Sequence, residues 1–292
     1  MADISVIAGP SSPDLAAGIA RRLRADLVST ELRVFSDGES KIRIDRPTGK
    51  KCVLVQSAHP PTDSNLMQAM MIARKCADDG AKVCLVMPYL AYARQDRAFL
   101  EGEGVSAALV ARLLEASGVS AIVTVDIHSQ MALSYFKNAR NVSSIPLLAE
   151  HAGKMKIKKP LVVSPDAGGA NRAEEFATLL KADAMALKKS RNRKTGEVSI
   201  EKIDFDISDR DAILIDDMIS SGSSIVKAAE VLRKAGACNV YAMCAHALLV
   251  GDAAQRIMAS GVKDIVATNS IPGRYAKVDM SAPLADGARS AL

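Results

Sequence analysis

The chain has 292 residues, of which 49% are apolar and 24% are charged, and its net charge at pH 7 is +5. This composition excludes a largely disordered protein and gives no reason to expect a nucleic-acid partner, while the length fits two domains of roughly 140 residues each. Aromatic residues make up 3% with no Trp, so small aliphatic side chains must fill the interior, as in parallel α/β sheets.

Targeting and redox signals point to the cytoplasm. The N-terminal sequence MADISVIAG lacks a basic region followed by a long apolar run, and no uncharged apolar run approaches the ~20 residues of a membrane span. The five cysteines form no CxxC pair and most lie in apolar runs, which indicates a reducing compartment without disulfides. We therefore expect a cytoplasmic protein with no membrane association.

The first half of the chain alternates strands and helices. The apolar run 4–8 predicts a buried strand and 13–23 a one-sided helix, and two short alternating runs at 32–35 and 41–44 predict a hairpin. Further strands are expected at 52–56, 83–87 and 121–125, separated by helices at 65–78 and 105–117. This pattern is typical of a doubly wound parallel sheet.

The same alternation restarts after residue 143. Strands are expected at 161–164, 184–187, 212–215, 240–245 and 265–268, with helices at 170–180, 223–235 and 252–260. The last stretch, 276–292, is less regular. The sequence therefore predicts an α/β protein with two doubly wound parallel-sheet domains related by a pseudo-repeat, residues 1–143 and 144–275.

The segment 211–236 places two acids beside a small-residue loop. Asp216 and Asp217 follow the apolar run 212–215, and the loop 220–224 opens a helix. Amides and hydroxyls at a helix start suit a phosphate monoester, whereas adjacent carboxylates suit sugar hydroxyls or Mg²⁺. Together they indicate a pentose phosphate; the alternative is an ordinary turn with a serine-rich cap.

Two other strand ends carry polar residues. The sequence SPDAGG at 164–169 joins an apolar strand to a helix, and its adjacent glycines let the backbone approach an anion closely. His128 follows the strand 121–125, at the edge of the sheet where ligands gather. The alternatives are a plain Pro-Asp-Gly turn and a structural histidine.

Three strings remain to be explained. PYLAYARQDR at 88–97 contains arginines that can chelate phosphate oxygens or stack on a purine, although a solvated loop fits the bare pattern too. FSDGE at 35–39 lies between the two predicted hairpin strands, where Asp-Gly is usually only a turn. The cluster KKSRNRK at 188–194 carries five positive charges and indicates a local anion site, or else a solvated loop.

These strings, in this order, resemble the ribose-phosphate diphosphokinase (phosphoribosyl diphosphate, or PRPP, synthetase) family, whose domains are of the type I phosphoribosyltransferase-like fold. The segment 211–236 is similar to the family's ribose-5-phosphate loop, with Ser220 and Ser224 where an Asp and a Thr are usual. A Ser at the first of these places resembles the archaeal-type variant. The resemblance also implies that the tail 276–292 returns to the first domain.

The resemblance implies a role for each motif. It assigns catalysis to Lys189 and Arg191, with Lys188 as an alternative register for the lysine. It assigns ATP to Phe35, Asp37, Glu39, Arg94, Gln95, Arg97 and His128, and ribose 5-phosphate to Asp216, Asp217, Ser220, Ser221, Gly222, Ser223 and Ser224. It assigns the diphosphate loop to Asp166, Gly168 and Gly169, and contact with Mg²⁺ to His128 and Asp166.

The implied reaction transfers the diphosphoryl group of MgATP to the C1 hydroxyl of ribose 5-phosphate, giving PRPP and AMP for nucleotide biosynthesis. The implied assembly is a homo-oligomer, a dimer or a hexamer built of dimers, in which the hairpin at Phe35 completes a neighbour's adenine pocket. Two alternatives are a phosphoribosyltransferase, which would lack the 35–39 and 88–97 strings, and a catalytically silent homologue, against which the retained Lys189, Arg191, His128 and Asp166 argue.

Overall fold

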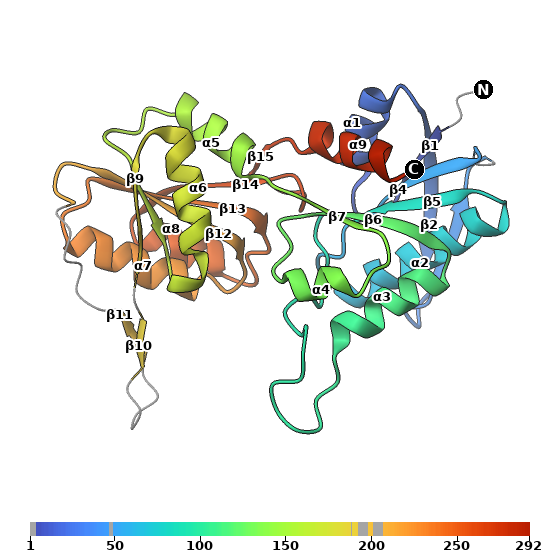
Figure 1. Ribbon diagram of the computed structural model, residues 1–292, viewed down its shortest axis with the longest axis horizontal. Helices are drawn as coiled ribbons and strands as arrows, with labels where there is room; N and C mark the ends of the chain where they lie inside the picture. The colour runs from blue at the N-terminus through green and yellow to red at the C-terminus, as the bar shows by residue number, and fades with distance from the viewer. Residues whose placement is uncertain (1–3, 47–48, 188, 192–197, 201–206) are drawn as a thin grey trace. The chain divides into compact units, whose positions relative to one another are not determined.

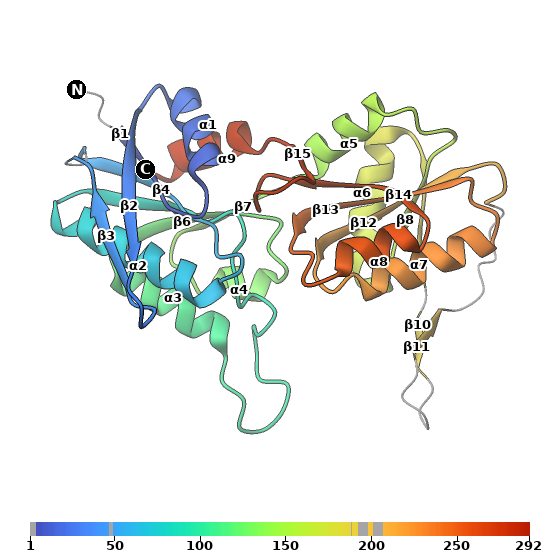
Figure 2. The ribbon, with the colours of Figure 1, turned by 180° about the vertical axis from the view of Figure 1, so that it is seen from behind.

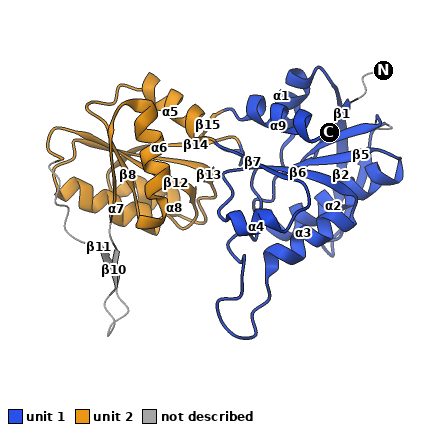
Figure 3. Cartoon of the chain, viewed as in Figure 1, with its two compact units in different colours: residues 1–143, 270–272, 279–292 blue, residues 144–269, 273–278 orange. Residues whose placement is uncertain are grey.

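The structure is a computed structural model that describes residues 4–46, 49–187, 189–191, 198–200 and 207–292 (Figure 1). The chain divides into two compact α/β units. Unit 1 comprises Met1–Ser143, Ser270–Pro272 and Asp279–Leu292, and unit 2 comprises Ser144–Asn269 and Gly273–Val278 (Figure 3). Within the described residues, no helix combines the length and hydropathy needed to cross a bilayer.

Unit 1 is built on a seven-stranded sheet in the order β3-β2-β1-β4-β5-β6-β7. The strands are β1 (Ile4–Ala8), β2 (Asp26–Val34), β3 (Ser40–Ile44), β4 (Lys51–Val55), β5 (Lys82–Val86), β6 (Val119–Val125) and β7 (Ala139–Val142). All neighbouring pairs are parallel except β2 and β3, which form an antiparallel hairpin. The loops after β5 and β6 therefore leave the sheet at the same edge.

Helices cover both faces of this sheet (Figures 1 and 2). α1 (Pro13–Leu23) and α9 (Ser281–Ala291) lie on one face, whereas α2 (Thr62–Asp78) and α3 (Ser106–Ala116) lie on the other; a short helix, α4 (Gln130–Ser134), follows β6. On the α2 and α3 side, Leu54, Leu85 and Ile122 of the strands form one buried cluster with helix side chains such as Ile72 and Leu114.

Unit 2 has a six-stranded, all-parallel sheet in the order β15-β14-β13-β12-β8-β9. The strands are β8 (Leu161–Ser164), β9 (Asp183–Ala186), β12 (Asp211–Ile219), β13 (Asn239–Ala247), β14 (Val262–Thr268) and β15 (Ala276–Val278). Two further short strands, β10 (Lys189–Arg191) and β11 (Val198–Ile200), pair antiparallel with each other.

Side chains of β12 alternate between two cores, as the two-residue period of a strand requires. Ile213 and Ile215 pack with α5 (Ile145–Lys154) and α6 (Ala170–Leu180), whereas Leu214 packs with α7 (Ser223–Lys234) and α8 (Ala253–Ala259). A sheet buried on both faces explains the nearly continuous apolar run in this strand. The predicted fold class, two doubly wound parallel sheets, is confirmed.

The structure corrects the expectation of an irregular tail at 276–292. Residues 276–278 form β15, which pairs with β14, and residues 281–291 form α9. β15 thus belongs to unit 2 and α9 to unit 1, whereas the sequence analysis assigned the whole tail to the first domain. β7, α4 and α5 were not predicted from the sequence, and α2 begins at Thr62, three residues before the predicted start at residue 65.

Candidate active site

The two acids of unit 2 lie inside strand β12, near its C-terminal end, and not after it. The backbone amide of Asp217 donates to Oδ1 of Asp216 over 2.9 Å, and the amide of Met218 donates to Oδ1 of Asp217 over 2.8 Å. Nη1 of Arg172, on α6, lies 3.5 Å from Oδ1 of Asp216 and 3.9 Å from Oδ1 of Asp217. The pair is therefore held in place by backbone amides and one shared cation.

Burial and mutual proximity perturb the titration of this pair. The pKa of Asp216 is raised to about 7, mainly by burial and then by the hydrogen bond and the charge of Asp217. The positive charge of Arg172 lowers this pKa and so offsets part of the rise. Two carboxylates this close disfavour a second negative charge, so they share a proton near neutral pH. A diol hydroxyl would find both a carboxylate acceptor and a partly protonated neighbour here.

The serine-rich loop follows β12 directly and turns into α7. Gly222 adopts a φ of +76°, and a Cβ there would lie 2.8 Å from Cδ1 of Ile257. Both the backbone conformation and the close contact therefore favour glycine at this position. Nη2 of Arg256 donates to the carbonyl of Ser221 over 2.7 Å, and the hydroxyls of Ser221 and Ser223 lie 3.2 Å apart. The loop presents exposed hydroxyls at Ser221, Ser223 and Ser224 beside the N-terminus of a 12-residue helix.

The SPDAGG loop leaves the neighbouring strand, β8, at the same edge of the sheet. Oδ1 of Asp166 accepts from the amide of Gly168 over 3.1 Å and caps the short 3-10 helix η1 (Ala167–Gly169). A Cβ at residue 169 would lie 2.4 Å from Oγ of Ser164, so only glycine fits at that position. Because adjacent strands are about 4.8 Å apart, this loop and the Asp216 pair are neighbours.

Arg172 is a residue that the sequence analysis missed. It lies on α6 just after the glycine pair, where a Cβ added to Gly169 would come within 3.7 Å of its Nη1, and the same nitrogen faces both acids. The sequence contains a signal for it: a cation three residues beyond the SPDAGG loop, at the start of a helix that must pack against the sheet. Arg172 lies between the SPDAGG loop and the acidic pair.

In unit 1, His128 follows β6 in a tightly constrained turn. Asp126 has a φ of +35°, and the amide of Ile127 donates to Oδ1 of Asn141 over 2.9 Å. Oγ of Ser129 caps α4 by accepting from the amides of Met131 and Ala132. His128 itself is exposed at the sheet edge where the loop after β5 also emerges.

The Arg94 loop is tied to the His128 loop by Asp96. Oγ of Ser129 donates to Oδ2 of Asp96, and the hydroxyl of Tyr135 donates to the Asp96 carbonyl over 2.7 Å. The sequence alone indicates no role for Asp96, because its partners Ser129 and Tyr135 lie 33 and 39 residues further along the chain. The structure therefore brings the Arg94 string and His128 together.

The side chains at the other positions of this loop differ in what they contact. Nε2 of Gln95 donates to Oε2 of Glu103 and to the carbonyl of Arg97, and the Arg97 guanidinium lies 5.2 Å from the ring centre of Phe99. Arg94 is exposed. In this conformation the side chains of Gln95 and Arg97 contact other residues of the same loop, whereas the exposed side chain of Arg94 can reach a ligand.

The FSDGE turn lies at the far side of the same sheet. The amide of Phe35 donates to the Glu39 carbonyl over 2.8 Å, Oδ1 of Asp37 accepts from the Glu39 amide, and Gly38 has a φ of +94°. β1, β4 and β5 lie between β2 and β6, a lateral separation of about 19 Å at 4.8 Å per strand. The structure thus does not bring the exposed Phe35 ring beside His128 of its own unit.

The basic cluster is described only in part. Lys188 lies outside the described residues, as do 192–197. Lys189 and Arg191 lie on β10, which pairs in register with β11 so that residue 189 faces Ile200 and residue 191 faces Val198. For these two strands the structure describes the backbone only.

Family models match two parts of the chain. Residues 4–118 match the N-terminal domain of ribose phosphate pyrophosphokinase, and residues 196–283 match the phosphoribosyl synthetase-associated domain. The first match contains the FSDGE and PYLAYARQDR strings, and the second contains the serine-rich loop and the two acids.

Curated relatives match along nearly the whole chain. The ribose-phosphate pyrophosphokinase of Methanopyrus kandleri is 37% identical over 96% of this chain and 97% of its own length, and that of Sulfurisphaera tokodaii is 35% identical over 94% and 95%. The enzyme of Haemophilus influenzae is 35% identical over 99% and 96%. The crystal structure of phosphoribosylpyrophosphate synthetase from Mycobacterium smegmatis superposes with a TM-score of 0.88 at 28% identity, covering 99% of this chain and 98% of that one.

Proposed function

The chain belongs to the ribose-phosphate pyrophosphokinase family, and from that premise we propose that it transfers the diphosphoryl group of ATP to the C1 hydroxyl of ribose 5-phosphate, giving PRPP and AMP. The observation that carries this proposal is similarity to pyrophosphokinases over both units. A phosphoribosyltransferase would not explain the match of residues 4–118 to the pyrophosphokinase N-terminal domain.

Ribose 5-phosphate is proposed to bind at the end of β12. The 5-phosphate would accept from amides and hydroxyls of the loop 220–224, where the positive end of α7 favours an anion. The carboxyl groups of Asp216 and Asp217 would bind the ribose hydroxyls. Ser220 takes the place of the family's usual acid, so this loop places less negative charge near the phosphate.

The diphosphate group of PRPP and the metal are proposed to lie at the SPDAGG loop. Gly168 is exposed, so an anion can approach its backbone, and the carboxylate of Asp166 is the hard oxygen donor that Mg²⁺ prefers. Among the described residues no cluster of three or more His, Cys, Asp or Glu side chains could hold a metal. That fits Mg²⁺, which is usually bound by one or two carboxylates together with substrate phosphates.

His128 suits Mg²⁺ less well than Asp166 does, because an imidazole nitrogen is a softer ligand than a carboxylate oxygen. When bound, the ion would neutralise charge on the phosphate oxygens. We propose that Asp166 contacts the metal, and that exposed His128 contacts the nucleotide phosphates or the metal. Arg94, positioned through Asp96 and Ser129, would bind the ATP phosphates.

Catalysis is proposed to rest on Lys189 and Arg191. Negative charge spreads over the oxygens of the transferring group, so cations brought to it lower the barrier. The two positions are two residues apart on β10.

The adenine pocket is proposed to be shared between subunits of a homo-oligomer. Support comes from the position of the Phe35 hairpin, which lies several strands away from the Arg94 and His128 loops of its own sheet. A hairpin with an exposed aromatic tip can complete a site of a symmetry-related copy. We also place the enzyme in the cytoplasm, which agrees with the five cysteines being free.

The test is an assay of purified protein with ATP, ribose 5-phosphate and Mg²⁺, followed for AMP and PRPP. Equimolar formation of both is expected, and omission of either substrate should abolish it. Formation of a nucleotide from PRPP and a purine base instead would identify a phosphoribosyltransferase. A folded protein that binds ATP but forms no product would be a silent homologue.

A further inference from the structure

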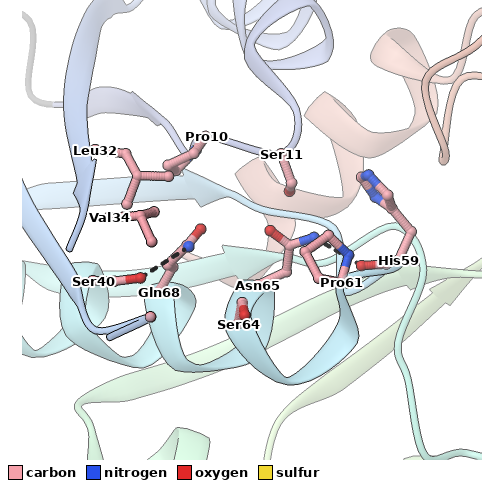
Figure 4. A pocket seen from close by; sticks show the side chains of 11 residues that line it. Pro10, Ser11, Leu32, Val34, Ser40, His59, Pro61, Ser64, Asn65 and Gln68 are labelled. Carbon is pink, nitrogen blue, oxygen red and sulfur yellow. Dashed lines mark hydrogen bonds between the residues drawn. The ribbon is translucent and has the colours of Figure 1, made fainter. Parts of the chain in front are cut away.

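A cavity of about 410 Å³ lies in unit 1 at the turn end of the β2–β3 hairpin (Figure 4). Its walls come from the loop after β1, the two hairpin strands, the loop after β4 and the first turns of α2. Apolar side chains line one side, among them Pro10, Leu32 and Val34. Figure 4 shows Gln68 and Ser40 at one end of the cavity and His59 at the other.

Two polar atoms in this lining lack partners. Among the described residues, the buried side-chain nitrogen and oxygen atoms without a hydrogen bond are Nδ1 of His59 and Oε1 of Gln68, and both residues line this one cavity. Gln68 is 4% exposed, and its Nε2 donates to Oγ of Ser40 over 3.3 Å. A buried acceptor left unpaired is costly, and folded proteins normally pair it with protein, water or ligand.

The lining specifies the chemistry of the missing partner. The described residues that line the cavity include no Asp, Glu, Lys or Arg, and burial lowers the pKa of His59, so the imidazole is neutral at pH 7. An anion such as a phosphate therefore finds no counter-charge there. Oε1 of Gln68 needs a donor, and the hydroxyl of Ser40, which accepts from Gln68, keeps its own hydrogen to donate.

An adjacent donor and acceptor on one planar edge is the pattern that a carboxamide pairs with on a nucleobase. The apolar side chains would cover the faces of such a ring, and the volume lies at the small end of ordinary ligand pockets. We propose that this cavity binds an uncharged heterocycle with an amino group, of the size of a purine base. Gly38 of the FSDGE turn lines the cavity, but Phe35, Asp37 and Glu39 do not, so the cavity lies beside the proposed ATP-binding side chains and uses different residues.

The test uses the full-length protein with adenine as the probe. Titration should shift the methyl NMR signals of Leu32 and Val34, and calorimetry should give a matching dissociation constant. Gln68→Met keeps the side-chain length but removes the acceptor, so adenine should bind at least about 5-fold more weakly, as expected for one lost hydrogen bond. Gln130→Met, at an exposed position on α4 in the same unit, is the matched control and should bind as the wild type does.

Two further measurements keep the proposal testable if Gln68→Met fails to fold. Ser64 is exposed and lines the cavity, so Ser64→Phe should block binding without burying a new group in the core. Phe35→Ala weakens the proposed ATP site, where adenine can also stack, so the adenine-induced shift of the Leu32 methyl signals should persist in this variant. Loss of that shift would assign the probe to the ATP site and overturn the proposal.

Three other outcomes would also overturn it. The first is the absence of any methyl shift at millimolar adenine, which would mean that water alone fills the cavity. The second is unchanged affinity in both Gln68→Met and Ser64→Phe. The third is AMP binding as tightly as adenine with the same methyl shifts, because the cavity would then accept a charged ligand.

Discussion

The proposed ribose 5-phosphate site of unit 2 is built on regular elements, whereas the proposed ATP site of unit 1 is built on loops. In unit 2 the two acids lie within β12, and only residues 220–222 separate that strand from α7. In unit 1 the whole segment 87–105 joins β5 to α3, and Leu100 within it is 71% exposed. Sites on strands and helices hold a geometry more closely than sites on loops.

The glycines of the two sites show the same contrast. Gly222 is packed against Ile257, but a Cβ at Gly102 would have no heavy atom within 4 Å, although both glycines have positive φ. The loop of unit 1 instead depends on individual side-chain hydrogen bonds, from Tyr92 to Asp63 and from Ser129 to Asp96. Steric packing thus adds to the polar contacts that fix the site of unit 2, whereas the loop of unit 1 depends on polar contacts.

The largest expected effect lies outside both sites, on β10. Lys189→Ala and Arg191→Ala should each lower kcat by about 10²-fold or more, with little change in either KM, because these cations would act on transition-state charge. Steady-state kinetics measures this. Lys188→Ala is the control, and if it alone lost kcat the catalytic lysine would be residue 188. A rise in KM without loss of kcat would reassign the cluster to ATP binding.

Phe35→Ala should raise the KM for ATP about 5- to 150-fold, because base stacking on an aromatic ring is worth roughly 1–3 kcal/mol. The KM for ribose 5-phosphate, set by the other unit, should not change. Mixing Phe35→Ala with Lys189→Ala protein then tests whether the pocket is shared. After subunit exchange, activity should recover in sites that combine an intact hairpin with an intact β10. No recovery despite proven exchange would show that the hairpin serves its own chain.

Gly222→Ala should weaken ribose 5-phosphate binding about 5- to 30-fold, because the new methyl both strains the backbone and displaces Ile257. Calorimetry with ribose 5-phosphate measures this affinity. Gly102→Ala carries a similar backbone penalty in open space, so it should leave the ATP and ribose 5-phosphate affinities within about 2-fold of wild type. Equal effects of the two substitutions would remove the steric distinction between the sites.

Asp96→Asn and Ser129→Ala should each raise the KM for ATP about 5- to 15-fold, since a hydrogen bond to a charged group contributes roughly 1.5 kcal/mol. The double variant should be little worse than either single one, because both remove the same contact. Additive effects in this cycle would mean that Asp96 and Ser129 act separately, and that the two loops are not coupled through them.

The smallest effect concerns pH. The pKa of Asp216 is raised to about 7, so between pH 4 and 7 the folded state holds a proton that the unfolded state has lost. Its contribution to stability is present at low pH and is lost as pH rises through 7. Asp217→Asn removes a hydrogen bond and a charge, so the pKa of Asp216 should fall, although burial keeps it above its usual value. Carboxyl ¹³C NMR measures it; an unchanged midpoint would exclude coupling.

Much of the fold could be predicted from sequence because the central strands are continuous apolar runs. The elements β7 and α9 were not predicted, and each omission has a physical reason. β7, with the sequence ARNV, is an edge strand without an apolar pattern. α9 is rich in alanine and contains a proline and a glycine, so only its tertiary contacts reveal it: a Cβ at Gly287 would lie 2.9 Å from Cγ1 of Val123.

The candidate site, too, could be predicted only in part. The loops at 164–169 and 220–224 were predicted from short sequence strings, because the need for glycine or serine in such loops depends on the local backbone. Arg172 and the partners of Asp96 could not be assigned, because each acts on a residue of another element that only the folded sheet brings near. The cavity beside Gln68 has no sequence signal, because its five segments are scattered between residues 10 and 68.

The position of α9 has a consequence for synthesis on the ribosome. This last helix packs on α1 and on β5, β6 and β7 of the first-made sheet, and Nη2 of Arg140 donates to the carbonyl of Ser290 over 3.1 Å. Unit 1 therefore emerges first but cannot complete its fold until residues 281–291 leave the exit tunnel, by which time unit 2 can already be compact. A premature stop before residue 281 would leave a finished unit 2 joined to an uncovered unit 1, a natural substrate for chaperones and proteases.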